Sequence, residues 1–176
     1  MKPQDIFGKK IFISPLDWGL GHCARIIPII DLLKKNGNQI FIGVNPQQKL
    51  FFEREEKKYQ LIPFDGYDFK IPKKNWELNF ALQSPSLAKK LKKERLELDK
   101  LMAEHQFDIV VSDHRYGLYH SGATSVFLTH QLKLPADFFA KSINAIHQKK
   151  MLNFDFVWVC QVHNIWQCHI SMNRIH

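Results

Sequence analysis

The chain has 176 residues, of which 45% are hydrophobic, and it carries a formal net charge of +8 with a pI near 9.4. At roughly 150 residues per domain, this length holds one complete α/β domain and excludes a fold that needs two. The longest apolar run, around Ile26 to Leu33, is interrupted by Pro28 and Asp31 and is far shorter than the ~20 residues that span a bilayer. The N-terminus lacks the apolar segment of a secretory signal, and three cysteines are too few for a disulfide framework. We therefore expect a soluble cytoplasmic protein.

The positive charge is concentrated in one helical stretch that also carries acidic side chains. Its basic residues are Lys89, Lys90, Lys92, Lys93 and Arg95. Basic and acidic side chains at i,i+4 spacing are typical of a solvated helix face, although a basic helix can also dock on anionic lipid. No basic motif interleaved with aromatic residues accompanies it, so nucleic acid is not an expected partner. We expect at most a peripheral contact with the inner face of the membrane.

Strand and helix patterns alternate along the first part of the chain. The apolar run 10–14 predicts a strand and the Pro- and Gly-containing segment 15–21 predicts a loop. Residues 22–35 predict a helix that has Ile26, Ile29, Ile30 and Leu33 on one face. A strand at 39–44, a helix at 46–56 and a strand at 59–63 follow. This alternation predicts an α/β fold: a Rossmann-like parallel sheet with helices on both faces.

The middle of the chain continues this pattern after an irregular segment. Residues 64–79 show no clear periodicity and predict an excursion over the sheet edge, while residues 86–105 predict a long helix. Strands are expected at 107–112 and 125–129, and polar side chains follow both: Asp113 and Arg115 after the first, His130 after the second. Because ligands bind at the carboxyl edge of an open α/β sheet, these side chains are expected at one cleft.

The composition changes near the C-terminus. Residues 152–159 predict a last strand, yet residues 156–176 contain no Asp, Glu, Lys, Gly, Pro or Ala. Zinc-ligand types crowd the tail: Cys160, His163, Cys168 and His169. Their spacing matches no common zinc finger. We therefore expect one domain over residues 1–159 and an atypical tail over 160–176 that is not native to the fold, as a reading-frame shift or a truncation would produce. Trp158, Ile165 and Trp166 would then expose apolar surface that a second domain or a C-terminal helix would ordinarily cover.

The loop after the first strand carries the most informative motif. Residues Gly19-Leu-Gly-His-Cys-Ala24 fit the pattern G-x-G-x-x-A at a predicted helix start, where small residues let backbone N–H groups approach an anion. An NAD site would need an acidic residue at the end of the second strand, where Val44-Asn45 stands instead. His22 places an imidazole at the sheet edge and predicts either a helix cap or an acid–base catalyst.

Three segments together resemble a known family. The run Ser14-Pro-Leu-Asp-Trp-Gly-Leu-Gly-His-Cys-Ala-Arg25, followed by Pro28, resembles the N-terminal signature of bacterial family 28-like glycosyltransferases of GT-B fold, which are related to the UDP-N-acetylglucosamine transferases of cell-wall lipid synthesis. Asp113-His-Arg-Tyr-Gly117 and Thr129-His-Gln131 resemble two further segments of that subgroup. The resemblance covers about residues 10–159. It implies two facing Rossmann-like domains, of which the N-terminal one binds the acceptor and the C-terminal one the UDP-sugar donor.

The resemblance also implies roles for individual residues. His22 would be the general base, Gly19 and Gly21 would line the cleft, and Arg25 would lie one helical turn further on. Asp113, Arg115 and His130 would face the same cleft. No Asp-x-Asp motif is present, so we expect neither a metal ion nor another cofactor. The expected function is that of the acceptor-binding half of a sugar-nucleotide-dependent glycosyltransferase, truncated and inactive until a donor domain completes it, with an unidentified acceptor.

Two other functions stay open at this point. A sugar-nucleotide epimerase of the same architecture would need carboxylates in the cleft, for which Asp17 and Asp113 are the candidates. A non-catalytic binding domain would suit the unusual tail. A serine hydrolase is not expected, because Ser112, Asp113 and His114 are consecutive whereas the side chains of a triad converge from separate loops.

Overall fold

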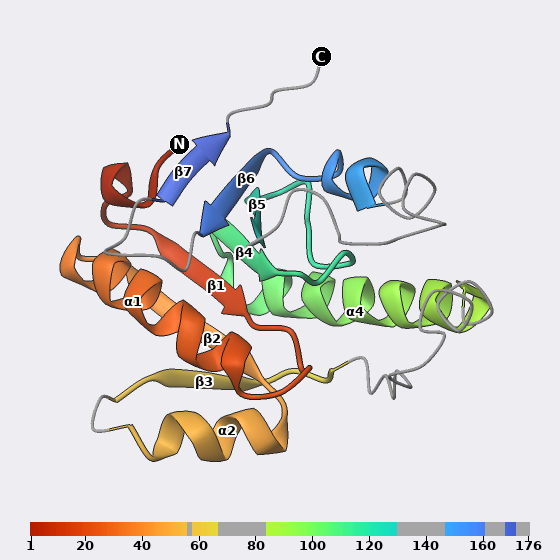
Figure 1. Ribbon diagram of the computed structural model, residues 1–176, viewed down its shortest axis with the longest axis horizontal. Helices are drawn as coiled ribbons and strands as arrows, with labels where there is room; N and C mark the ends of the chain where they lie inside the picture. Colours follow the sequence, from red (N-terminus) through yellow and green to blue (C-terminus); the bar gives the residue numbers. More distant parts are fainter. Residues whose placement is uncertain (56–57, 67–83, 130–146, 161–167, 172–176) are drawn as a thin grey trace.

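The computed structural model describes residues 1–55, 58–66, 84–129, 147–160 and 168–171 (Figure 1). The strands are β1 (Lys10–Ser14), β2 (Gln39–Val44), β3 (Gln60–Pro63), β4 (Ile109–Asp113), β5 (Thr124–Thr129), β6 (Phe156–Cys160) and β7 (Cys168–Ser171). The helices are the 3-10 helix η1 (Pro3–Asp5), α1 (Gly21–Lys35), α2 (Pro46–Glu53) and α4 (Ser84–His105). Residues 147–151 are also helical.

All of these strands belong to one sheet, in the order β3-β2-β1-β4-β5-β6-β7. The strands from β3 to β6 pair in parallel, and β7 pairs with β6 in the antiparallel direction. The register places Ile11 of β1 opposite both Ile40 of β2 and Ile109 of β4. A parallel sheet with the order 3-2-1-4-5-6 is that of the Rossmann fold. The predicted fold class is therefore confirmed.

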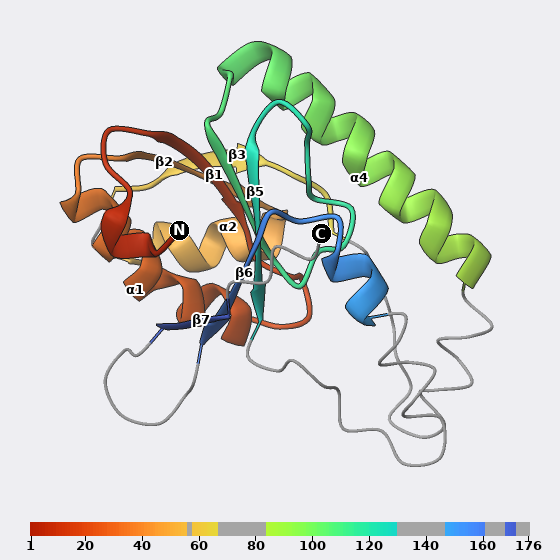
Figure 2. The ribbon, with the colours of Figure 1, turned by 90° about the horizontal axis from the view of Figure 1, so that it is seen from above.

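Helices cover both faces of the sheet, with α1 and α2 on one side and α4 on the other (Figure 2). Side chains of a strand alternate between the two faces. In β1, Ile11 and Ile13 accordingly join the apolar cluster under α1, whereas Phe12 joins a second cluster with Leu98 of α4. This two-sided burial explains why the central strands read as uninterrupted apolar runs instead of alternating patterns.

The helix boundaries follow from local signals in the sequence. Gly37, with a φ of +74°, takes the left-handed conformation that ends α1 after the predicted basic residues. The start of α2 is a capping box between Asn45 and Gln48, and this helix ends at Glu53, earlier than predicted. Pro28 lies inside α1. The predicted excursion over residues 64–79 lies outside the described residues from residue 67 onward.

The described part of the tail forms strand β7, in which Ser171 pairs with Val157 and Cys168 pairs with Cys160. Trp158 was expected to be exposed, and this was wrong: its side chain is fully buried in the cluster under α1. Met1 packs against that cluster and its carbonyl oxygen accepts a hydrogen bond from Nε1 of Trp158 at 3.1 Å. The suggestion that the tail is foreign to the fold stays a prediction.

Within the described segments, no helix combines the length and the apolar character that crossing a bilayer requires.

Candidate functional site

The candidate site lies where the strand order changes direction. From β1 the sheet continues through β2 on one side and through β4 on the other. In open α/β sheets, ligands bind outside the carboxyl ends of the strands at such a switch point. The loop that joins β1 to α1 and the loop that follows β4 meet there. At this edge, His22 lies in the first turn of α1, and Asp113 is the last residue of β4.

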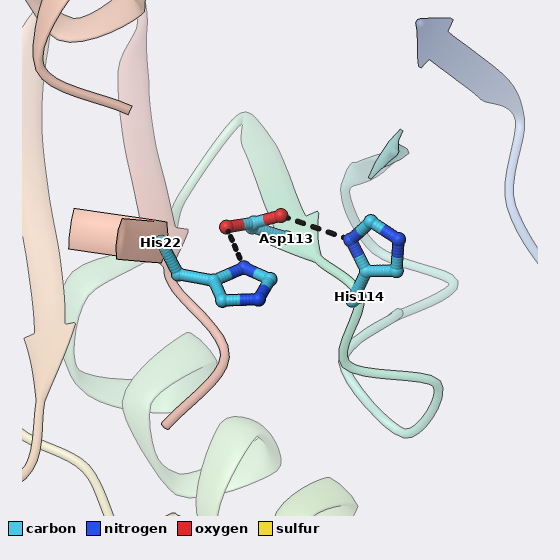
Figure 3. Close-up of side chains that lie close together, drawn as sticks. All are labelled: His22, Asp113 and His114. Atoms are coloured by element: carbon cyan, nitrogen blue, oxygen red, sulfur yellow. Dashed lines mark hydrogen bonds and ion pairs between the residues drawn. The ribbon is translucent and has the colours of Figure 1, made fainter. Parts of the chain in front are cut away.

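Asp113 is the centre of the site, and its side chain has no exposed surface. One carboxylate oxygen, Oδ2, lies 2.7 Å from Nδ1 of His22, and the other, Oδ1, lies 3.1 Å from Nδ1 of His114. Figure 3 shows the carboxylate between the two imidazole rings. Arg25 adds a positive charge, with its Nη2 at 3.7 Å from Oδ1. The structure thus brings together three predicted residues, His22, Arg25 and Asp113.

These contacts determine the protonation of Asp113. Burial by itself raises the pKa of a carboxyl group, because desolvation disfavours its charged form. Here that effect is outweighed by the hydrogen bonds from His114 and His22 and by the charges of His22 and Arg25, which lower the pKa of Asp113 to about 2. Asp113 is therefore a carboxylate at neutral pH, and it accepts a hydrogen bond from each ring.

This carboxylate also fixes the tautomer of His22. Two groups approach Nδ1 of His22: Oδ2 of Asp113 at 2.7 Å and Nη2 of Arg25 at 2.6 Å. The contacts compete, because Nδ1 carries either a proton or a lone pair. We assign a proton to Nδ1, since a hydrogen bond to a buried carboxylate is the stronger of the two. In the neutral ring, Nε2 then holds the lone pair and can accept a proton from a ligand.

The glycine loop precedes this ring and leaves open space at the start of α1. Gly19 has a φ of +83°, which residues with a Cβ rarely adopt. Gly21 begins α1, and an added Cβ there or at Gly19 would meet no atom within 4 Å. The N-cap residue is Leu20, which makes no side-chain cap to the first helical turn. Backbone N–H groups at such a helix start can bind an anion.

Arg115 was predicted to line the cleft, but its side chain is buried, with 1% exposure. Its Nε donates to Oε1 of Glu94 at 2.5 Å, and its Nη2 donates to the carbonyl oxygen of Asp65. The second carboxylate oxygen of Glu94 accepts from the backbone N–H of Gly117 at 3.0 Å. Arg115 thus joins α4 to the loop after β4. Its contacts are with other parts of the fold and point to a structural role. His130 lies outside the described residues.

Sequence reasoning missed two residues of this region. Glu94 was interpreted as part of a solvated helix face, yet it is almost fully buried, and its spacing of four residues from buried Leu98 was the available signal. His114 was considered only as part of a hydrolase triad. Its φ of +59° is unusual for a residue other than glycine and turns the chain directly after β4.

The same three side chains have the ligand types of a metal centre. One ligand atom from each of His22, Asp113 and His114 lies within 4.8 Å of the others, and imidazole and carboxylate bind Zn²⁺ and non-haem iron. However, the guanidinium of Arg25 already lies 2.6 Å from Nδ1 of His22. Because it would repel a second cation, we interpret the cluster as a hydrogen-bonded acid–base group.

The position where an NAD site needs an acidic residue is occupied by Asn45, whose side chain accepts a hydrogen bond from the N–H of Gln48 and caps α2.

Two basic side chains of α4 have partners within the chain. Lys93 contacts Asp65 at 2.7 Å and Glu97 at 3.5 Å, and the guanidinium of Arg95 lies 3.4 Å from the ring centroid of Tyr119. Intramolecular contacts therefore account for these two basic side chains.

Comparison with known proteins finds no family model, curated protein or solved structure that matches this chain.

Proposed function

We propose that this chain is the acceptor-binding half of a sugar-nucleotide-dependent glycosyltransferase, with His22 as the general base. The observation that carries the proposal is the pairing of His22 with the buried carboxylate of Asp113 at the switch point of a Rossmann-like sheet. An imidazole whose Nδ1 proton is held by a carboxylate presents Nε2 as a proton acceptor. The resemblance of residues 14–25 to the family signature supports the choice of reaction.

In the proposed step, the acceptor hydroxyl lies against Nε2 of His22. Its oxygen attacks the anomeric carbon of the donor sugar, and the bond between that carbon and the diphosphate oxygen breaks. The hydroxyl proton moves to Nε2, and the carboxylate of Asp113 stabilises the imidazolium that forms. The diphosphate takes the electron pair and leaves. A separate donor-binding domain holds the UDP-sugar in this proposal, and no metal ion takes part.

The contacts of Asp113 argue against its use as the base of an epimerase. An epimerase needs a carboxylate that reaches a carbon atom of the substrate. Asp113 is completely buried, and each of its oxygens already accepts a hydrogen bond from an imidazole. Removing a substrate proton with Asp113 would require both of these contacts to open.

The assignment of UDP-sugar binding to a separate domain can be tested on this chain alone. Because the donor is assigned to a separate domain, calorimetric titration with a UDP-sugar should detect no tight binding. A dissociation constant in the micromolar range would contradict that assignment.

A test of the role of His22 requires a chain that also contains a donor-binding domain. UDP release in the presence of a UDP-sugar and an extract of hydroxyl-bearing lipids and saccharides would report transfer. His22→Ala should lower turnover by about 10²- to 10⁴-fold, the usual effect of losing a general base. His105→Ala is the matched control, because His105 lies at the C-terminal end of α4 beside Glu104. Turnover of His22→Ala within a few-fold of the parent would reduce His22 to a helix residue without a catalytic role.

A further inference from the structure

We propose that His114 is a positioning residue that fixes the carboxylate of Asp113 in the orientation that His22 needs. The inference deepens the proposed function, because it concerns the group that orients the general base. It starts from the observation that Asp113 serves two imidazoles at once, at 2.7 Å and 3.1 Å (Figure 3). A carboxylate held at one oxygen can rotate about its χ2 torsion. A carboxylate held at both oxygens has a defined plane.

His114 is itself held firmly by strand β5. Its backbone N–H donates to the carbonyl oxygen of Leu128 at 3.2 Å, and its Nε2 lies 3.0 Å from Oγ1 of Thr129. The ring also packs against Phe127, with 5.7 Å between the ring centroids. Neighbouring strand β5 therefore sets the position of the His114 ring independently of the loop that carries it.

With both rings neutral and Nδ1 of His22 protonated, as assigned above, the contacts form a chain of hydrogen bonds. In this assignment, the hydroxyl of Thr129 donates to Nε2 of His114, and Nδ1 of His114 donates to Oδ1 of Asp113. Oδ2 is then available to accept from Nδ1 of His22, which leaves Nε2 of His22 with its lone pair. The chain runs from β5 through the end of β4 to the first turn of α1.

The backbone supports a functional interpretation of His114. Its φ of +59° is in the left-handed region, where a residue with a Cβ is strained by roughly 1–2 kcal/mol relative to its ordinary conformations. Glycine or asparagine would suit that backbone better. Backbone strain of this kind is often found at functional sites. The imidazole is the feature of His114 that glycine cannot replace.

The backbone conformation also suggests the set of variants. His114→Gly suits the positive φ and removes the side-chain donor. His114→Ala removes the donor without relieving the backbone. His114→Asn tolerates the positive φ and retains an N–H donor in reach of Oδ1. The three variants therefore separate the role of the ring from that of the backbone.

The test measures the His22 ring in the chain as it exists, without turnover. Nitrogen-15 NMR of histidine-labelled protein at neutral pH should show His22 protonated at Nδ1, with a slowly exchanging proton. In His114→Ala and His114→Gly we expect that proton signal to disappear through exchange, with the ring interconverting between both tautomers. His114→Asn should restore the signal. In the chain extended by a donor-binding domain, His114→Ala and His114→Gly should lower kcat about 10- to 100-fold, the usual effect of a slightly misplaced catalytic group. The KM of both variants should stay within about 2-fold of the parent value.

Three results would overturn the proposal. The first is a wild-type spectrum without the Nδ1 proton. The second is an Ala or Gly variant that keeps the wild-type spectrum. The third is a Gly variant that fails to fold, which would show that His114 serves the fold itself. Absence of glycosyl transfer together with the expected spectra would contradict the proposed function and leave the positioning role of His114 intact.

Discussion

Asp113 shows how a single residue can link the stability of this protein to its chemistry. A carboxylate without exposed surface is unfavourable unless partners replace the lost hydration. His22, His114 and Arg25 are those partners, and they lower the pKa of Asp113 in spite of its burial. The group that would orient the general base therefore also stabilises the native state in its charged form.

This pKa predicts how the stability of the protein depends on pH. The folded-state pKa of about 2 lies below the ordinary value of 3.8. The carboxylate therefore contributes about 2 kcal/mol to the free energy of unfolding above pH 4, and this contribution is lost as the pH falls from about 4 to about 2. Asp113→Asn removes the contribution at every pH. Urea denaturation should accordingly show a difference between wild type and Asp113→Asn at neutral pH that narrows below pH 4.

The neutral variant also faces a local problem. The amide of Asp113→Asn has one oxygen for two imidazole donors, so one donor is left facing an NH₂ group. A buried unsatisfied group of this kind costs about 1–3 kcal/mol. A stability difference that stays constant from pH 6 to pH 2 would show that Asp113 is not the group that titrates.

At the scale of elements, the buried ion pair between Glu94 and Arg115 connects helix α4 to the end of β4. The two side chains are 3% and 1% exposed. The carbonyl oxygen of Asp65 accepts from the same guanidinium, whose Cζ lies 4.7 Å from the ring centroid of Phe64. Three segments far apart in the sequence therefore meet at Arg115, which follows His114 in the loop after β4.

Breaking this pair should be strongly destabilising. Arg115→Met leaves the carboxylate of Glu94 buried without its cation, and such losses typically cost 3–5 kcal/mol. Chemical denaturation of Arg115→Met, Glu94→Leu and the double variant would measure the effect. The double variant should lose less than the sum of the single variants, because it buries no unpaired charge.

Lys93 provides the control for this experiment. It pairs with Asp65 at the surface, where both side chains are more than half exposed. Lys93→Met should therefore change stability by no more than about 1 kcal/mol. A loss of less than 1 kcal/mol for Arg115→Met as well would mean that the buried pair does not hold α4 in place.

At the scale of the whole molecule, the described part of the C-terminal segment, β7, is the edge strand of the sheet beside β6. Strand β6 pairs with β5 over four positions on its inner side, and β7 adds an antiparallel partner on its outer side. The core side chain of β6, Trp158, is bonded to Met1 at the opposite end of the chain. Removing β7 would leave both of these contacts in place.

We therefore expect deletion of residues 160–176 to change the thermal midpoint by less than about 5 °C and to improve solubility. A larger loss, equivalent to roughly 1–2 kcal/mol for a domain of this size, would identify the tail as an integrated part of the fold. Differential scanning calorimetry of the two chains would distinguish these outcomes.

The sequence was informative wherever local patterns decide structure. The apolar runs around Phe12 and Val110 predicted strands β1 and β4, and the glycine loop at Gly19 predicted where α1 starts. Alternation of strand and helix was sufficient to predict the parallel sheet, because parallel strands need helical crossovers. His22 and Asp113 were also predictable as neighbours, since His22 follows β1 and Asp113 ends β4 at the same edge of the sheet.

Tertiary structure decided what depends on contacts between distant segments. The spacing of Glu94 from Leu98 indicates the buried face of α4, but the partner of Glu94 could not be predicted from α4 alone, because Arg115 comes from another element. The role of His114 depends on a left-handed backbone and on Thr129 of the next strand. Trp158 is buried because Met1 and the cluster under α1 reach it. The sequence by itself determined the elements and the edge at which polar residues gather, whereas three-dimensional packing decided which polar groups pair, since pairing depends on distances that no local pattern encodes.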